Sequence, residues 1–542
     1  MRPIYGPDPN GINALNGTSP ADATWSSINL AEAVPGVMTP LCASVWVPAS
    51  ELGLREPFVA MGALPIRRGR IPTSSSDRIT NAFFGRMAVR VDFLCEMGDL
   101  LPGQSGEALA RDFFGFVPPD FCSSPSIRRL PFILARYPRT LFTIGRRIHA
   151  LRSDTDRWWR SEILTMPGHV LTRAQRAATE ARERFFDALA AQAVISATLI
   201  QPLQEQLATL CGKSGVDPAV LLRGASHEES VVLQDLWSAS RGVITVEEFT
   251  LRHGYHGPGE GELETRVWRE DLDAVRNLVE RYRNRPDSDA PTADAADRQA
   301  QSDAAEAALL SGLSRAEILR ASLVLRLARR YIPLRGTGKV SYLQCLDVLR
   351  ASARHIGALL VDADRIDEID DTFYLTADEL SGPILTDPSS DLREIVAARR
   401  ELRLKYQALT IPHAWTGAPK PQVLDEPIAG SVTSLSGIGT CSGIVEGRAV
   451  VVVDPTDADV DDGDILIAHT TDPSWVSLMF LSAALVVDIG GMMSHAAVVA
   501  RELGIPCVMN TGNGTKALRT GDLIRVDGSA GTVEILTPAA TS

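Results

Sequence analysis

The sequence pattern changes across a proline- and glycine-rich stretch at residues 411–436, and this change most constrains the fold. Before it, apolar residues recur at three- and four-residue spacing over long segments, which is typical of amphipathic helices. After it, β-branched runs such as 449–453 and 484–488 alternate with turns and a helical segment, as in a compact β/α domain. We therefore predict a multidomain protein, with a mainly α-helical region over residues 1–410 and a β/α domain over 437–542.

Two segments of the chain are predicted to connect rather than to pack. Residues 286–306 are rich in Asp, Ala, Ser, Gln and Pro and nearly lack large apolar side chains. Such a composition buries too little apolar surface to offset the entropy lost on ordering, so we expect a flexible loop or a frayed helix end there. The stretch 411–436 is either an ordinary interdomain connection or a semi-rigid tether that lets a small domain swing.

Composition excludes several classes of protein. The 542 residues are 45% hydrophobic and 22% charged, which fits a globular protein with real cores. The net charge of −13 argues against nucleic acid as a partner, because phosphate backbones require clustered Lys and Arg. We recognise neither a signal peptide nor an apolar run of roughly eighteen residues, so no membrane span is predicted. The cysteines lack metal-ligand spacing, so we predict reduced thiols, a cytoplasmic protein and no metal site on this chain.

A histidine, His495, follows a glycine pair and opens a short predicted helix. Ser494 is a favourable N-cap, the run that follows is helix-forming, and Gly504 ends it. Free N–H groups at a helix start favour an anion, and Gly490 and Gly491 permit its close approach. We therefore predict that His495 accepts a phosphoryl group, with Gly490, Gly491 and Ser494 binding phosphate. The alternative is a histidine that only caps a surface helix.

Residues 437–536 resemble the mobile phosphohistidine domain of the PEP-utilising enzyme family, which includes PEP synthase, pyruvate phosphate dikinase and rifampin phosphotransferase. The resemblance is carried by motifs in family order at 439–449, 463–468, 470–475, 490–506 and 526–533. It implies that His495 is the phosphorylated residue. It also implies a swivelling domain that moves between a donor site and an acceptor site about the 411–436 linker.

A weaker resemblance covers much of residues 22–410. The segment 25–41 is similar to the start of the acceptor-binding region of rifampin phosphotransferase-like proteins. The segment 253–260 resembles a Gly-Pro-Gly-Glu element of those proteins, with His256 standing where they commonly carry Arg. The resemblance therefore implies that the helical region binds the phosphoryl acceptor.

The segment 253–260 also has a chemical interpretation of its own. It gathers His253, His256 and Glu260 among glycines, and such side chains can orient or deprotonate an acceptor hydroxyl. We therefore propose these three as catalytic candidates. The alternative is a Gly-Pro loop whose polar side chains only form hydrogen bonds with helix ends, and the sequence leaves both open.

Three cations are candidates for neutralising the transferring phosphoryl group: Arg266, Arg335 and Lys339. Arg335 and Lys339 also follow the family pattern. Taken on its own, each is more often an ordinary surface cation than a phosphate ligand.

In this family an ATP-grasp domain, usually on the same chain, charges the histidine. We recognise no such module, no phosphate-binding loop ending in Gly-Lys-Ser or Gly-Lys-Thr, and no PEP-binding barrel. The resemblance then implies a separate ATP-grasp subunit that binds Mg²⁺ and ATP, as in two-component phenylphosphate and 4-methylphenyl-phosphate synthases. It further implies a small hydroxylated acceptor, phenol or an alkylphenol, with AMP and phosphate released.

Two other functions stay open at this point. The chain is alternatively a component of an antibiotic phosphotransferase of the rifampin type, with a larger acceptor cavity. It is alternatively a non-catalytic docking protein that retains the swivel fold. The presence of His495 and the two glycines argues against the docking protein, because docking requires neither.

Overall fold

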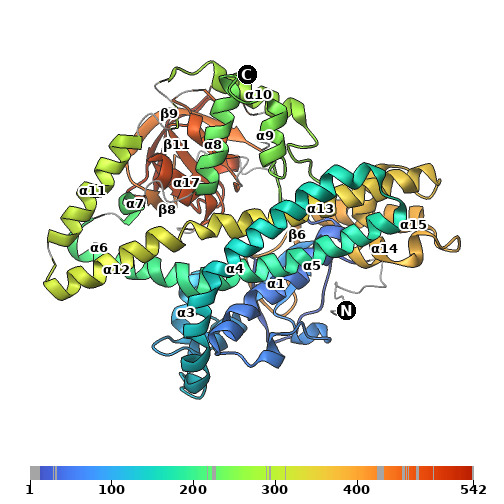
Figure 1. Ribbon diagram of the computed structural model, residues 1–542, viewed down its shortest axis with the longest axis horizontal. Helices are drawn as coiled ribbons and strands as arrows, with labels where there is room; N and C mark the ends of the chain where they lie inside the picture. The colour runs from blue at the N-terminus through green and yellow to red at the C-terminus, as the bar shows by residue number, and fades with distance from the viewer. Residues whose placement is uncertain are drawn as a thin grey trace. The chain divides into compact units, whose positions relative to one another are not determined.

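The computed structural model describes residues 13–539, apart from 28–29, 31–32, 217, 223–226, 288–289, 292–294, 312, 424–432, 454–457, 459, 462, 472–474 and 492–493. The chain forms two compact units (Figure 1). Unit 1 contains residues 1–202, 261–264 and 337–424. Unit 2 contains residues 203–260, 265–336 and 425–542. The middle of the predicted linker, 424–432, lies outside the described residues.

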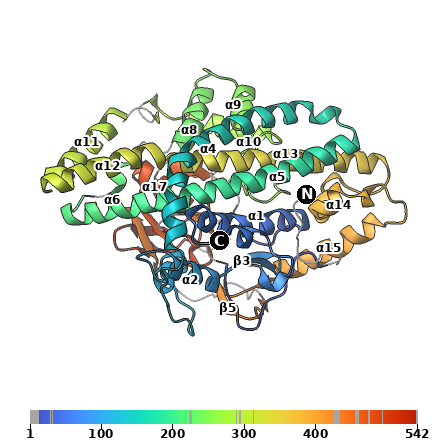
Figure 2. The same ribbon diagram turned by 60° about the horizontal axis from the view of Figure 1, so that its bottom comes forward.

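The core of unit 1 is formed by long helices. Helix α1 (Pro40–Met61) packs along α5 (Leu171–Ile195), and α4 (Leu130–Thr165) contacts both. Figures 1 and 2 show α13 (Leu334–Asp362) beside them. The buried face of α5 is rich in alanine, and small side chains let helices approach closely. Aromatic rings fill the space that remains, and the ring centroids of Tyr342 of α13 and Trp46 of α1 lie 6.1 Å apart.

Smaller elements complete unit 1. An antiparallel sheet has the strand order β2-β3-β1-β5, from Thr80–Phe83, Arg86–Arg90, Thr24–Ser26 and Ala414–Thr416. The other elements are α2 (Val91–Leu100), α3 (Gly106–Phe114), α14 (Ala377–Ser381), α15 (Leu392–Gln407), β4 (Leu409–Thr410) and β6 (Gln422–Val423). Trp25 is fully buried in this sheet, with its ring 5.0 Å from that of Phe83.

One helical run, Leu171–Gly212, is long and apolar enough to cross a membrane by length and composition alone. It continues α5 through the π-helical turn Ser196–Ile200 into α6 (Gln201–Ser214). Of its most apolar window, 56% is buried inside the protein. A buried core helix passes the same test, so the run is weak evidence for a membrane span.

Helices also make up the first part of unit 2. They are α7 (Pro218–Leu221), α8 (His227–Ser240), α9 (Val246–His253), α10 (Leu272–Arg283), α11 (Ala295–Ser311) and α12 (Arg315–Tyr331), together with most of α6. The sequence analysis placed these residues within a region spanning 1–410. The structure instead groups 203–260 and 265–336 with the C-terminal domain.

Residues 286–306 are predicted to form a flexible loop or a frayed helix end, and the segment is helical from Ala295 onward, where α11 begins. This half of the segment is rich in Ala and also contains Gln, and both are strong helix formers. The same helix carries Leu309, which is fully buried in a cluster with Leu207 and Leu325. Tertiary burial just beyond the polar segment therefore stabilises this helix, whereas composition alone left a loop and a frayed helix end both open.

The C-terminal part of unit 2 is a sheet with the order β7-β14-β13-β9-β10-β11-β12-β8. Its strands are Ser434–Ser436, Thr532–Thr537, Leu523–Asp527, Ile444–Val452, Ile465–Ala468, Ala484–Val487, Cys507–Met509 and Ile438–Cys441, in that order. The strands β9, β10, β11 and β12 are parallel to one another, and the outer pairs are antiparallel. With the helical first part of the chain, this sheet confirms the predicted fold class.

Alternate side chains of the parallel strands enter two different cores. Ile465, Ile467 and Val486 face a core that also contains Val526. Leu466 and its counterparts on neighbouring strands face the opposite side, because successive strand residues point to opposite faces. Strands β10 and β11 are therefore buried on both faces.

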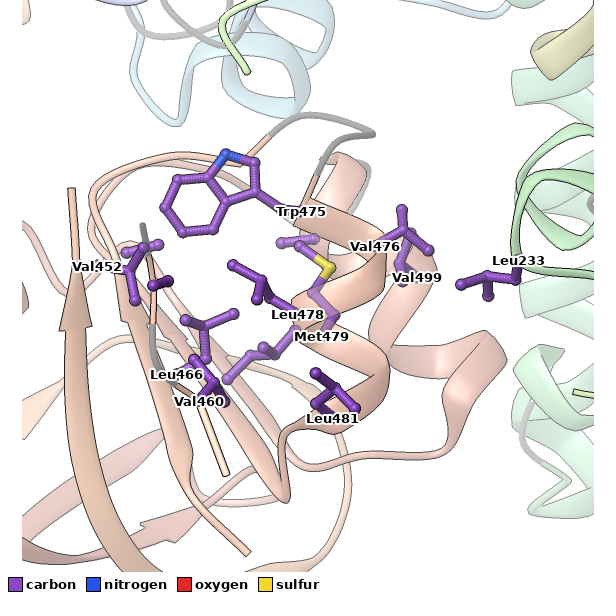
Figure 3. Packing of buried hydrophobic residues seen from close by; sticks show 14 of the residues in the cluster. Leu233, Val452, Val460, Leu466, Trp475, Val476, Leu478, Met479, Leu481 and Val499 are labelled. Atoms are coloured by element: carbon purple, nitrogen blue, oxygen red, sulfur yellow. The ribbon is translucent and has the colours of Figure 1, made fainter. Parts of the chain in front are cut away.

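The second core is covered by helices of the same unit. Helices α16 (Val476–Leu481) and α17 (His495–Leu503) lie over the sheet, and α8, α9 and α10 contribute to the same cluster. Figure 3 shows Leu478 of α16 pointing toward Leu466 of β10, and the ring of Trp475 lying on the side of Val452. Leu233 of α8 reaches toward Val499 of α17 (Figure 3).

Candidate functional site

Helix α17 begins at His495, as the sequence predicts. Ser494 is its N-cap, with φ −67° and ψ 162°, and its side chain accepts a hydrogen bond of 3.4 Å from the amide of Ala497. Gly504 ends the helix in the left-handed conformation, at φ 73°. The local signals for this helix are therefore read correctly from the sequence.

The glycine pair before α17 has an open backbone. Gly490 adopts φ 148°, a conformation that residues with a side chain rarely adopt. A Cβ added at Gly491 would meet nothing within 4 Å. The amide of Ser494 donates to the carbonyl of Gly491 at 3.0 Å. Gly491 thus leaves room before the start of α17, and the proposed role of Gly490, Gly491 and Ser494 in phosphate binding stays a prediction.

Three polar residues follow the parallel strands at the edge where the chain enters α17. His469 comes directly after β10, Asp488 directly after β11, and Thr511 shortly after β12. Carboxyl ends of parallel strands lie at the same edge of a sheet, which is where open α/β sheets bind ligands. Nδ1 of His469 lies 3.3 Å from a carboxylate oxygen of Asp488. This pair is a feature that the sequence analysis missed.

Asp488 is 1% exposed and firmly held. Thr511 donates its hydroxyl at 2.9 Å, and Thr515 donates both its amide and its hydroxyl. Burial acts to raise the pKa of Asp488, but hydrogen bonds from His469, Thr515 and Thr511 outweigh it and hold that pKa below its ordinary value. Asp488 is therefore an anion at neutral pH and accepts the Nδ1 proton of His469.

The structure brings His253, His256 and Glu260 into one neighbourhood of unit 2. Nδ1 of His256 lies 2.8 Å from a carboxylate oxygen of Glu260, and Nε2 of His253 lies 2.8 Å from Asp235 of α8. The amide of His256 also donates to the carbonyl of His253 at 3.0 Å. Each candidate imidazole is therefore paired with a carboxylate.

Aromatic rings enclose these pairs. His256 is 4% exposed and Glu260 4% exposed, and the His256 ring lies 4.4 Å from that of Tyr255 and 5.8 Å from that of Trp268. Burial lowers the pKa of His253, although the hydrogen bond to Asp235 opposes this. The loop is thus a sealed polar cluster rather than an open cleft.

The three candidate cations occupy different settings. Arg266 is exposed, and its backbone carbonyl packs close to Gly257. Arg335 and Lys339 are half-buried on the first turns of α13, four residues apart and hence on one helix face. Arg335 falls in unit 2 and Lys339 in unit 1. Their proposed role in phosphate binding stays a prediction.

Arg501 has a structural partner near the candidate site. Its Nε donates to the carbonyl of Thr440 in β8 at 3.0 Å, which ties the C-terminal turn of α17 to the sheet. Within the described part of the chain, no group of three or more His, Cys, Asp or Glu side chains is placed to hold a metal ion.

Comparison with known families gives two matches. The PEP-utilising enzyme mobile domain matches residues 460–531, which include β10, α17 and the glycine pair. The rifampicin phosphotransferase fourth domain matches residues 164–336, which include the His256–Glu260 loop. The resemblance to PEP-utilising enzymes is confirmed. The phenylphosphate synthase type stays a prediction.

Individual relatives agree with these matches. An uncharacterised protein of Mycobacterium tuberculosis (strain ATCC 25618 / H37Rv) is 35% identical over 218 residues, 40% of this chain and 25% of that protein. The rifampicin phosphotransferase of Streptomyces sviceus is 39% identical over 192 residues, 33% of this chain and 21% of that protein. That of Bacillus subtilis (strain 168) is 37% identical over 183 residues, 32% of this chain and 20% of that protein. The chain thus spans a quarter or less of the length of these relatives.

Proposed function

We propose that this chain is a phosphohistidine carrier in an ATP-dependent phosphotransferase. The observation that carries the proposal is the start of α17. There a histidine opens a capped helix four residues after Gly491, inside a segment that matches the PEP-utilising mobile domain. Exposed amides and the positive end of the helix dipole favour the anionic phosphoryl group that His495 would carry.

The proposed reaction has two balanced steps. In the first, a neutral ring nitrogen of His495 attacks the phosphorus of the donor, an N–P bond forms, the donor O–P bond breaks, and the ring N–H proton is released. In the second, an acceptor hydroxyl attacks the same phosphorus, an O–P bond forms, the N–P bond breaks, the hydroxyl loses its proton, and the departing ring nitrogen takes up one proton. The imidazole returns to its starting state, so donor and acceptor never share one pocket.

We assign the donor to a separate ATP-grasp subunit that binds Mg²⁺ and ATP, with AMP and phosphate as products. The acceptor is a small hydroxylated aromatic compound, phenol or an alkylphenol. Arg266, Arg335 and Lys339 are the cations proposed to neutralise the phosphoryl group at the acceptor. For the acceptor step we keep His256, oriented by Glu260, and His253 as candidate bases. Because both imidazoles are buried, acceptor access would require the 253–260 loop to open.

The first step is testable without the partner subunit. Potassium phosphoramidate transfers a phosphoryl group to imidazole nitrogen directly, with ammonia leaving. We expect ³¹P NMR of the treated wild-type chain to show an acid-labile phosphohistidine that is absent from His495→Ala. The control His149→Gln, at an exposed histidine of α4, should be labelled like the wild type. Equal labelling of wild type and His495→Ala would overturn the proposal.

The relay itself requires a donor protein. ATP labelled in the β-phosphoryl group, together with a purified ATP-grasp protein, should label the wild type and not His495→Ala. Phenol added to the labelled chain should then discharge it as phenyl phosphate. Discharge by rifampicin and not by phenol would instead favour the antibiotic phosphotransferase, which the identity to rifampicin phosphotransferases also supports. Absence of labelling of the wild type with every donor would favour the docking protein.

A further inference from the structure

The His469–Asp488 pair is unlike the other histidine–carboxylate pairs of unit 2. The side chain of His469 is 60% exposed, whereas Asp488 is 1% exposed and accepts hydrogen bonds from Thr511 and Thr515. An ion pair made only for stability would gain little at such an exposed site. A buried carboxylate that fixes an exposed imidazole is an arrangement suited to orienting that ring toward a ligand.

Strand register fixes where His469 lies. Ala468 of β10 pairs with Val487 of β11, so His469 and Asp488 leave the sheet side by side. The amide of Asp488 donates to the carbonyl of Ala468 at 3.0 Å, and that of Ile489 donates to the carbonyl of His469 at 2.9 Å. The backbone pairing thus continues past the strand ends and holds His469 next to the segment that leads into α17.

The start of α17 is close to this pair along the chain. Two residues after Ile489 comes Gly491, so their Cα atoms are at most about 8 Å apart. The carbonyl of Gly491 then accepts from the amide of Ser494 at 3.0 Å, immediately before His495. The exposed ring of His469 and the first residue of α17 therefore belong to the same edge of the sheet.

We propose that His469 is a second functional histidine, which binds the phosphoryl group carried by His495. Asp488 accepts the Nδ1 proton of His469, so Nε2 is the ring nitrogen left to face solvent. With both ring nitrogens protonated, Nε2–H donates a charge-assisted hydrogen bond to a phosphoryl oxygen. This contact forms and breaks no covalent bond, and it stabilises the loaded carrier. Asp488 acts through His469 and is a positioning residue.

The inference rests on the proposed function and is tested by the same chemical donor. His469→Gln keeps a polar side chain but cannot carry the positive charge of a doubly protonated imidazole. Because residue 469 is exposed, the substitution should not prevent the chain from folding. With potassium phosphoramidate, we expect phosphohistidine formation about ten- to hundredfold slower than in the wild type, as for loss of a hydrogen bond between charged groups. The ³¹P resonance of the residual phosphohistidine should also shift.

Three further variants separate the outcomes. His469→Lys restores a cation and should recover part of the rate, whereas His149→Gln should behave as the wild type. Asp488→Asn should slow loading in the same direction, with its melting temperature measured to detect any loss of folding. If His469→Gln loads at the wild-type rate with an unchanged ³¹P shift, the inference is wrong while the proposed function stands. If neither the wild type nor the variant forms phosphohistidine, the proposed function itself is wrong.

Discussion

Unit 2 contains two kinds of histidine site. At the edge of the sheet, His469 is exposed, is held by a buried carboxylate, and stands beside an open glycine turn. In the 253–260 loop, His256 and Glu260 are each 4% exposed beneath the rings of Tyr255 and Trp268. Both kinds pair an imidazole with a carboxylate, so pairing alone does not reveal function. Exposure and free space are what distinguish a site ready for a ligand from one that is sealed.

The most direct way to break this comparison is to remove one histidine from each site. His495→Ala should abolish phosphohistidine formation from phosphoramidate, whereas His256→Ala should leave it intact, because only the sheet edge is open to an anion. Quantitative ³¹P NMR of the two variants measures the difference. Loss of labelling in both, with both still folded by circular dichroism, would show that the two sites act together at the loading step.

The free energy of unfolding, unlike phosphohistidine formation, should depend on the sealed 253–260 loop. Glu260→Ala leaves His256 buried beside an empty position, and we expect the free energy of unfolding to fall by about 1–3 kcal/mol, the cost of an unsatisfied buried polar group. The matched control is Glu247→Ala, an exposed carboxylate on the first turn of α9. Urea unfolding monitored by circular dichroism makes the measurement. A change no larger than that of the control would mean that the loop is open in solution.

Removing the cap of α17 tests how firmly the helix start is held. Ser494→Ala deletes the acceptor of the hydrogen bond from the amide of Ala497, and we expect a loss of about 0.5–1 kcal/mol. Hydrogen exchange should become faster in the first turn of α17, and phosphoramidate labelling should slow. Ser105→Ala removes the equivalent cap of α3 in unit 1 and should leave labelling unchanged. Unchanged exchange in α17 would mean that packing, not the cap, defines its start.

The smallest expected effect is the change of the free energy of unfolding with pH that His253 causes. Burial lowers the pKa of His253 below its ordinary value of 6.5, although Asp235 opposes this. The unfolded chain therefore binds more protons than the folded chain between the folded-state pKa and 6.5, so the free energy of unfolding should rise with pH across that window. Melting temperatures of wild type and His253→Gln at stepwise pH measure this. Parallel curves for the two proteins would contradict the assignment.

Local signals in the sequence determined the helix around His495. Ser494 and Gly504 carry their own capping chemistry, and Gly490 permits a backbone that other residues rarely adopt. The β-branched runs at 449–453 and 484–488 likewise specify strands, and their residues 449–452 and 484–487 alternate between the two cores of the sheet. These features depend on residues near one another in the chain, so sequence reasoning reaches them.

Only the tertiary structure decided which of the histidines is open and which is sealed. His469 meets Asp488 because β10 and β11 pair in one particular register, and register is set by the whole sheet rather than by either strand. His256 is buried because Trp268, from beyond the loop, closes over it. Residues 203–260 and 265–336 join the C-terminal unit because α8, α9 and α10 share its apolar core. Burial and pairing across such sequence distances are collective, so no local pattern encodes them.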